Sequence, residues 1–201
     1  LMVLKIIHYH TFNSMTICCR HCGSFLYDQI LDLGHQPPSN AYLTEKQLLE
    51  PETTYPLKVY VCQACWLVQI PAHAKAHELF TSDYAYFSST SSSWCLHAKK
   101  FVLKAIKELD LNENSFVLEL ASNDGYLLQY LRDFGIPSIG IEPTHAAAEV
   151  ARSKGIKTIE SFFGESLATK LINENIHFKN KVDLVIANNV LAHVPDINDF
   201  L

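Results

Sequence analysis

Short apolar runs alternate with helical stretches from Ser115 to the end of the chain. Strands are predicted at 116–120, 138–142, 157–160 and 182–187, and helices at 94–109, 125–134, 144–153, 164–174 and from 195–196 onward. Strand and helix in rotation form βαβ units, whose parallel strands make one sheet covered by helices on both faces. The sequence therefore predicts an α/β, Rossmann-like domain. Ligands on such sheets bind beyond the carboxyl ends of the strands, so function is expected in the loops that follow them.

A second feature is a doubled C-x-x-C pattern near the N-terminus. Cys19 and Cys22 form one pair, Cys62 and Cys65 the other, and 39 residues separate the pairs. Two such pairs complete a tetrahedral four-sulfur shell, which leaves no open position for catalysis. The pattern predicts a structural zinc ion. Two further cysteines are left out of this site: Cys18 has the wrong spacing, and Cys95 falls on the core face of a predicted helix.

Changes in amino-acid composition and sequence pattern divide the chain into four segments. Residues 1–15 are interpreted as a non-native or disordered extension before a natural start at Met15, and residues 16–72 as a small irregular zinc-binding domain. Residues 73–90 form a Tyr- and Ser-rich connection expected to lie at an active site. Residues 91–201 form the α/β domain, which is expected to be incomplete because a full sheet of this kind needs more strands.

The turn after the first predicted strand, Glu119-Leu-Ala-Ser-Asn-Asp-Gly125, is the main cofactor signal. A nucleotide-binding turn carries small residues because the backbone approaches the ligand closely. Ala121 and Asn123 stand where the first two glycines of a methyltransferase turn would be, and G-x-G-x-x-G is absent. The turn therefore disfavours a pyrophosphate and fits S-adenosylmethionine, whose ammonium and sulfonium charges would meet the negative charges of Glu119 and Asp124.

Other strand ends extend this site. Glu142 ends the second strand, 17 residues after Gly125, where an acid accepts hydrogen bonds from both ribose hydroxyls. Asn188 ends the fourth strand beside the expected methionine moiety. The predicted cofactor-binding residues are Glu119, Ala121, Ser122, Asn123, Gly125, Glu142, Phe162 and Asn188.

Seven motifs, in order, resemble the sugar C-methyltransferases that act on nucleotide-linked deoxysugars in bacteria. They are CRHCG, LGHQPPSNAYL, YPLKVYVCQACWLVQ, SDYAYFSSTSSSW, ELASNDGYLL, GIEP and NNVLAHVPDINDF, and they run from about Cys19 to Leu201. The resemblance implies a zinc-binding domain, a Rossmann-like methyltransferase domain and a C-terminal α/β domain. This sequence would supply the first and most of the second.

The resemblance also implies a reaction and a substrate. A proton leaves a sugar carbon next to a ketone, and the resulting enolate attacks the cofactor methyl group, which requires a general base and oxyanion donors. The family's His base would lie beyond Leu201. Tyr84 and Tyr86 are the candidate catalytic residues, with packing between domains as the alternative. For His193, a structural role at the start of a helix is favoured over that of base.

Composition limits the remaining alternatives. The net charge is −5, and no apolar run approaches the ~20 residues of a membrane span, so neither nucleic acid nor membrane is an expected partner. No signal peptide is recognised, which favours a cytoplasmic location. One alternative is a methyltransferase of a non-sugar small molecule. Another is a zinc ribbon that binds protein or nucleic acid. Between Cys22 and Cys62, however, the only basic residues are Lys46 and Lys58, against five acidic residues, which argues against phosphate contacts.

Overall fold

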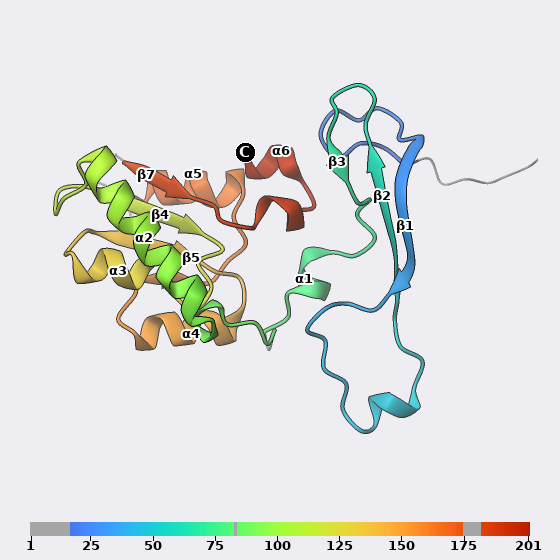
Figure 1. Ribbon diagram of the computed structural model, residues 1–201, viewed down its shortest axis with the longest axis horizontal. Helices are drawn as coiled ribbons and strands as arrows, with labels where there is room; N and C mark the ends of the chain where they lie inside the picture. Colours follow the sequence, from blue (N-terminus) through green and yellow to red (C-terminus); the bar gives the residue numbers. More distant parts are fainter. Residues whose placement is uncertain (1–16, 83, 175–181) are drawn as a thin grey trace, which may run out of the picture.

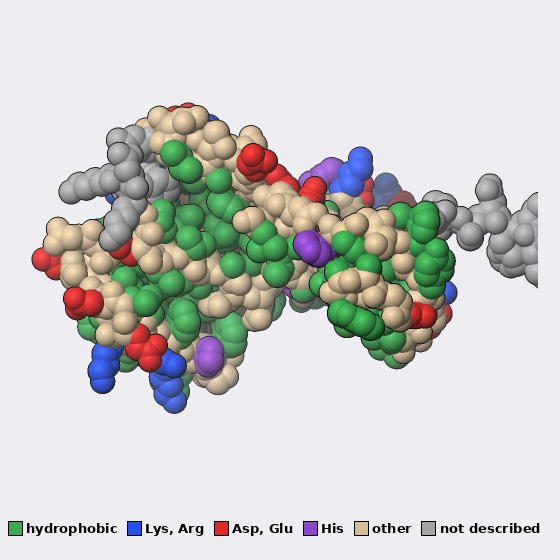
Figure 2. Space-filling view, turned by 90° about the horizontal axis from the view of Figure 1, so that it is seen from above, with side chains coloured by type: hydrophobic (Ala, Val, Ile, Leu, Met, Phe, Trp, Pro, Cys, Tyr) green, Lys and Arg blue, Asp and Glu red, His purple; other side chains and the backbone are tan. Residues whose placement is uncertain are grey.

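The computed structural model describes residues 17–82, 84–174 and 182–201. Figure 1 shows an antiparallel sheet on one side and a parallel sheet flanked by helices on the other, with the short helix α1 (Ala76–Leu79) between them. Figure 2 shows the same two lobes joined by a narrower region. The interpretation of residues 1–15 as an extension lies outside the described residues.

The N-terminal lobe is a three-stranded antiparallel sheet in the order β1-β2-β3. Its elements are β1 (Asp28–Gln36), the 3₁₀ turn η1 (Gln47–Leu49), β2 (Tyr55–Val61) and β3 (Val68–Gln69). Strand β1 was not predicted from the sequence, because eight of its nine residues are exposed and two register shifts interrupt its pairing with β2. Such a strand has no buried face, so it shows no apolar alternation.

The C-terminal lobe is a four-stranded parallel sheet in the order β6-β5-β4-β7. Its strands are β4 (Val117–Leu120), β5 (Ser138–Ile141), β6 (Thr158–Ile159) and β7 (Leu184–Ile186). The helices and 3₁₀ turns are η2 (Ser88–Thr90), α2 (Ser92–Leu109), α3 (Leu128–Asp133), α4 (His145–Ser153), α5 (Glu165–Asn173), η3 (Leu191–His193) and α6 (Ile197–Phe200). This alternation confirms the predicted α/β architecture.

Helices cover both faces of this sheet, because successive strand residues point to opposite sides. Val117 belongs to a buried cluster with side chains of α2 and α3, whereas Leu118 belongs to a second cluster with Leu171 of α5 and Phe200 of α6. Each fully buried Leu or Ile of this kind contributes roughly 1.5–3 kcal/mol of burial free energy. The two cores hold the carboxyl ends of the strands at one edge.

Two boundaries differ from those predicted. The helix expected from residue 125 begins at Leu128, because Gly125 has φ +74° and its N–H closes a turn on the Ser122 carbonyl at 3.1 Å. The last helix begins at Ile197, after Asp196, whose carboxylate accepts hydrogen bonds from two backbone N–H groups of the first turn. Of the helices in the described ranges, none has the length and hydrophobicity that crossing a membrane requires.

Candidate functional site

The four predicted zinc ligands lie together in the N-terminal lobe. Cys19 Sγ is 3.6 Å from Cys65 Sγ, and Cys22 Sγ is 3.5 Å from Cys62 Sγ. All four sulfur atoms lie within 4.8 Å of one another, and the four cysteines are not in disulfides. A tetrahedral zinc ion with Zn–S bonds of about 2.3 Å separates its ligands by about 3.8 Å. The donor set and its geometry therefore fit zinc.

The protein surrounding this cluster affects its cysteines differently. The pKa values of Cys19 and Cys22 are lowered. At Cys65 a hydrogen bond from the Leu67 backbone lowers the pKa, but burial and hydrogen bonds to the other three cysteines outweigh it and raise the pKa to about 12. Burial opposes ionisation of Cys19, but hydrogen bonds from the Cys22 backbone and the Gln69 side chain outweigh it and lower the pKa of Cys19 to about 6. Gln69 Nε2 donates to Cys19 Sγ at 3.1 Å, and Gln69 itself is buried. Zinc binds the deprotonated sulfur, so Gln69 supports the metal site without being a ligand.

A cavity of about 520 Å³ lies where the carboxyl ends of β4, β5 and β7 meet the connection and the N-terminal lobe. Its lining includes seven of the predicted residues: Tyr84, Tyr86, Ala121, Asn123, Glu142, Phe162 and Asn188. Three others do not line it: Glu119, Ser122 and Gly125. The volume suits one cofactor-sized molecule with room beside it.

The turn after β4 keeps a glycine-type backbone without most of the glycines. Ala121 has φ +55°, Asn123 φ +50° and Gly125 φ +74°, so every second residue adopts the left-handed conformation. Asn tolerates this region, whereas Ala adopts it at a cost of roughly 1 kcal/mol. At Gly125 a Cβ atom would also lie 2.3 Å from Ile156 Cδ1. The small side chains leave the turn open to the cavity, as a closely bound cofactor requires.

Glu142, at the end of β5, is held firmly beside this turn. Its Oε2 accepts a hydrogen bond from Asn123 N at 2.9 Å, and its Oε1 accepts from Thr144 N at 2.8 Å and from Thr144 Oγ1 at 2.5 Å. Burial raises the pKa of this carboxyl, and these three donors oppose the rise. Each carboxylate oxygen accepts more than one hydrogen bond, so Glu142 keeps capacity for ligand hydroxyls.

Glu119, on β4, is a buried acid with an unused oxygen. It is 1% exposed, and Oε2 has no hydrogen-bond partner among the described residues. Burial raises the pKa of Glu119 well above its ordinary value, and the nearby carboxylates of Glu142 and Asp124 raise it further. A buried acid among acids fits a ligand that brings positive charge, as S-adenosylmethionine does.

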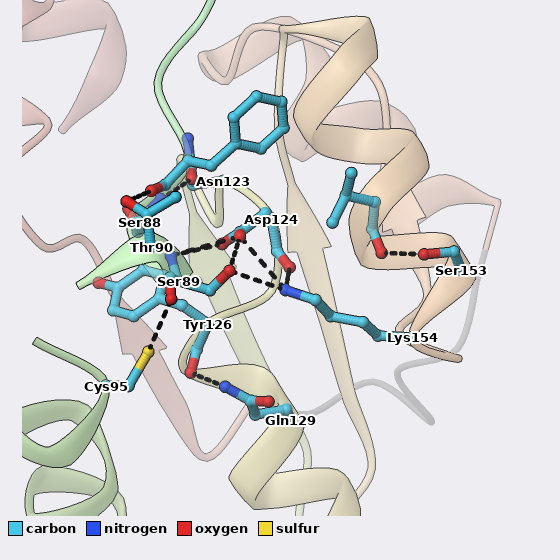
Figure 3. A network of polar contacts seen from close by, with 12 residues as sticks. Ser88, Ser89, Thr90, Cys95, Asn123, Asp124, Tyr126, Gln129, Ser153 and Lys154 are labelled. Carbon is cyan, nitrogen blue, oxygen red and sulfur yellow. Dashed lines mark hydrogen bonds and ion pairs between the residues drawn. The ribbon is translucent and has the colours of Figure 1, made fainter. Parts of the chain in front are cut away.

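Asp124 does not take the place expected for it. Its carboxylate is fully buried and pairs with Lys154 Nζ at 3.2 Å, while Ser89 donates to it through both N (3.3 Å) and Oγ (Figure 3). Asp124 is absent from the cavity lining. Its charge is paired with that of Lys154, so Asp124 offers the cavity no unpaired carboxylate.

The same network attaches the Tyr- and Ser-rich connection to the turn. Ser88 N donates to Asn123 Oδ1 at 2.7 Å, and Asn123 Nδ2 donates to the Tyr86 carbonyl at 3.0 Å (Figure 3 labels Ser88, Asn123 and Asp124). The connection carries Tyr84 and Tyr86 to the cavity, although Tyr86 is still 50% exposed. These contacts bring residues about 35 positions apart into one site.

Several lining residues had no role assigned from the sequence. They include Asn40, Phe80, Trp94 and Tyr126. Asn40 lies in the N-terminal lobe, within the motif LGHQPPSNAYL. No sequence pattern indicates that this loop lies near the ends of the parallel strands. His193, for which a structural role was favoured, also lines the cavity, and its ring lies 6.0 Å from that of Phe80 in an edge-to-face contact.

The zinc-binding lobe also bonds directly to the last helix. His21, between the first two cysteines, has Nδ1 at 2.8 Å from Asn198 Oδ1, and Asn198 Nδ2 donates to the His21 carbonyl at 2.9 Å. The neighbouring Asp199 and Phe200 line the cavity. The metal-binding turn is thereby linked to one wall of the cavity.

Known proteins match both lobes. Residues 19–80 match a family described as "Putative zinc binding domain", which agrees with the four-cysteine cluster, so the predicted zinc cofactor is supported. The curated C-methyltransferase NovU of Streptomyces niveus is 29% identical over 187 residues, which are 91% of this chain. The chain spans 42% of the length of that relative.

Solved structures match with low similarity. A SAM-dependent methyltransferase from Thiobacillus denitrificans, in complex with S-adenosyl-L-homocysteine, is 19% identical with a TM-score of 0.34, over 66% of this chain and 52% of that one. YjhP from E. coli is 14% identical with a TM-score of 0.30, over 44% and 37%.

A second family covers the rest of the chain. Its description is "Methyltransferase domain", and it matches residues 94–201, which are more than half of the sequence. The matched range contains the parallel sheet, the turn after β4 and Glu142, in agreement with the predicted S-adenosylmethionine-binding domain. The chain therefore belongs to the family of methyltransferase domains and carries a zinc-binding domain in front of it.

Proposed function

We propose that this protein is an S-adenosylmethionine-dependent C-methyltransferase that acts on a nucleotide-linked keto-deoxysugar. The observation that carries the proposal is the shared cavity: the cofactor-type turn and Glu142 line it together with Tyr84, Phe80 and His193. Similarity to a protein named as a C-methyltransferase supports carbon as the acceptor. The resemblance of the sequence motifs supports the sugar nucleotide.

The turn after β4 and the neighbouring acids would bind and orient the cofactor. Glu142 would accept hydrogen bonds from the ribose hydroxyls, and the open turn at Ala121 and Asn123 would admit the cofactor close to the backbone. The buried acid Glu119 would favour a cationic ligand by its charge, acting through the protein rather than by lining the cavity. When bound, S-adenosylmethionine supplies an electrophilic methyl group to a carbon nucleophile.

Tyr84 and Tyr86 would act on the acceptor sugar. A general base removes the proton from the carbon next to the ketone, and the electron pair of that C–H bond moves onto the carbonyl oxygen as an enolate. Tyr84 and Tyr86 are the proposed hydrogen-bond donors to this oxygen. A tyrosine hydroxyl held in the cavity can stabilise the negative charge of the enolate in place of a water molecule.

The test uses the natural full-length protein with S-adenosylmethionine and a panel of nucleotide-linked sugars, half of them carrying a ketone. Mass spectrometry is expected to find one added methyl group, on carbon, in keto-sugar nucleotides only. Tyr86→Phe is expected to lower turnover more than cofactor affinity. Methylation of a non-sugar acceptor, or methylation on oxygen, would overturn the proposal, as would retention of DNA or RNA by a protein that methylates nothing.

A further inference from the structure

The zinc-binding lobe places one polar side chain in the cavity of the methyltransferase lobe. Asn40 lies in the loop after β1, follows the Pro37-Pro38-Ser39 segment, and lines the cavity. It has φ +57°, in the left-handed region that Asn adopts more readily than most residues. An unusual backbone conformation at a cavity wall is the kind of local feature that often accompanies function.

The contact of Asn40 has a direction. Asn40 Nδ2 donates to Tyr84 Oη at 3.0 Å, across 44 positions of sequence. A phenol has one O–H to donate, and in this contact its oxygen is the acceptor. Within residues 17–82, 84–174 and 182–201, no acceptor is recorded for the Tyr84 O–H, so this proton remains available to a ligand.

The ring of Tyr84 is also held in place. It lies edge-to-face with Phe80 at 5.2 Å between centroids, and Tyr84 N donates to the Thr81 carbonyl at 3.1 Å. Because the ring is held, the remaining freedom of the Tyr84 hydroxyl is rotation about its C–O bond. On the side of the oxygen that Asn40 occupies there is a donor and no acceptor, so the O–H points away from Asn40.

We infer that Asn40 of the zinc-binding lobe is a positioning residue that fixes the Tyr84 hydroxyl as a hydrogen-bond donor into the cavity, toward a carbonyl or enolate oxygen. The inference rests on the proposed function. A hydroxyl that accepts one hydrogen bond becomes a stronger donor of the next, because the bonds in a chain polarise one another. The zinc-binding lobe thereby contributes to the chemistry and does more than support the fold.

The decisive variant is Asn40→Asp. It keeps the shape of the side chain and tolerates positive φ, but a carboxylate only accepts, so the Tyr84 O–H turns away from the cavity. We expect turnover of the full-length protein to fall at least tenfold while its melting temperature is unchanged or higher. Tyr84→Phe is expected to lower turnover by about 10²-fold, the usual effect of losing one oxyanion donor. Cofactor affinity stays within twofold in both variants.

Four further variants complete the design. Asn40→Gly removes the amide without strain at positive φ, and in the Tyr84→Phe background neither Asn40 change should lower turnover further. Thr44→Ala, in the same loop but outside the cavity lining, is the matched control and should keep full turnover. Full turnover by Asn40→Asp, or additive losses in the double variants, would overturn the inference.

A second readout needs no turnover. Asn40→Gly and Tyr84→Phe should each lower the melting temperature by about 2–4 °C, and the double variant should fall by less than their sum. Additive shifts would overturn the Asn40–Tyr84 contact. If the wild-type protein methylates no keto-sugar nucleotide, the proposed function fails, whereas this thermal cycle still decides whether Asn40 holds Tyr84.

Discussion

Lys154 Nζ lies 3.2 Å from Asp124 Oδ2 and 2.8 Å from the Asp124 carbonyl oxygen, and so joins the end of helix α4 to the turn after β4. The Asp124 side chain is 1% exposed, and that of Lys154 is 27% exposed. Lys154 also donates to Ser89 Oγ at 3.3 Å, so the same ammonium group contacts the connection. One cation thus holds three segments at the back of the cofactor turn (Figure 3).

Lys154→Met should destabilise the protein strongly. Removing one partner leaves the buried Asp124 carboxylate uncompensated, at a cost of about 3 kcal/mol in the free energy of unfolding. The double variant Lys154→Met with Asp124→Asn should recover much of this loss, because no charge is left behind. Urea denaturation measures both, with Lys107→Met, an exposed lysine on α2, as the control. Equal losses in the single and double variants would contradict the electrostatic explanation.

The purified protein should contain one zinc ion per chain, bound by the four cysteines at about 2.3 Å. Cys62→Ser should abolish the bound zinc, and chelation should lower the melting temperature because the small lobe has little core of its own. Elemental analysis and X-ray absorption give the metal content and the Zn–S distance. Cys18→Ser is the control and should keep one zinc; a zinc-free wild-type protein would refute the assignment.

Glu142→Ala should weaken the binding of S-adenosylmethionine by about ten- to a hundredfold, or roughly 1.5–3 kcal/mol. The physical reason is the loss of a carboxylate that, in the proposed site, would accept hydrogen bonds from two ribose hydroxyls. Calorimetry measures the affinity, and Glu142→Gln checks that loss of charge rather than disruption of the turn is responsible. Glu149→Gln, on an exposed part of α4, should bind as wild type. Unchanged affinity in Glu142→Ala, or tighter binding of NAD, would place the ribose elsewhere.

Stability should fall as pH rises through the raised pKa of Glu119. Burial, together with Glu142 and Asp124, raises the folded-state pKa of Glu119 above its ordinary value of 4.5. Between these two values the folded state binds more protons than the unfolded state, so the free energy of unfolding decreases with increasing pH. The contribution of Glu119 to the free energy of unfolding is fully present below its pKa in the unfolded state. It is lost above its pKa in the folded state.

Glu119→Gln should remove that slope and stabilise the cofactor-free protein at neutral pH, because the amide carries no charge to bury. Chemical denaturation at a series of pH values measures the effect, and Glu113→Gln, in an exposed loop, is the control. A slope that survives in Glu119→Gln would assign it to another group. The variant should also bind the cationic cofactor more weakly, so stability and affinity should change in opposite directions.

Much of the fold follows from local patterns. The four strands and the helices between them were predicted within a few residues, because burial on both faces produces apolar runs and helical periodicity that short windows reveal. The cysteine pairs were recognisable for the same reason, since C-x-x-C is a local spacing. Strand β1 escaped prediction because its exposed side chains carry no such pattern.

The sequence by itself determined the order of strands and helices in the α/β domain, the four-sulfur site and a cofactor turn whose Ala121 and Asn123 replace glycines, since neighbouring residues specify each of these. Only the tertiary structure decided that Asp124 pairs with Lys154 and that Asn40 donates to Tyr84. These contacts join segments 30 and 44 positions apart. Their existence depends on how two cores and a connection pack, and packing over such separations leaves no periodic trace in the sequence.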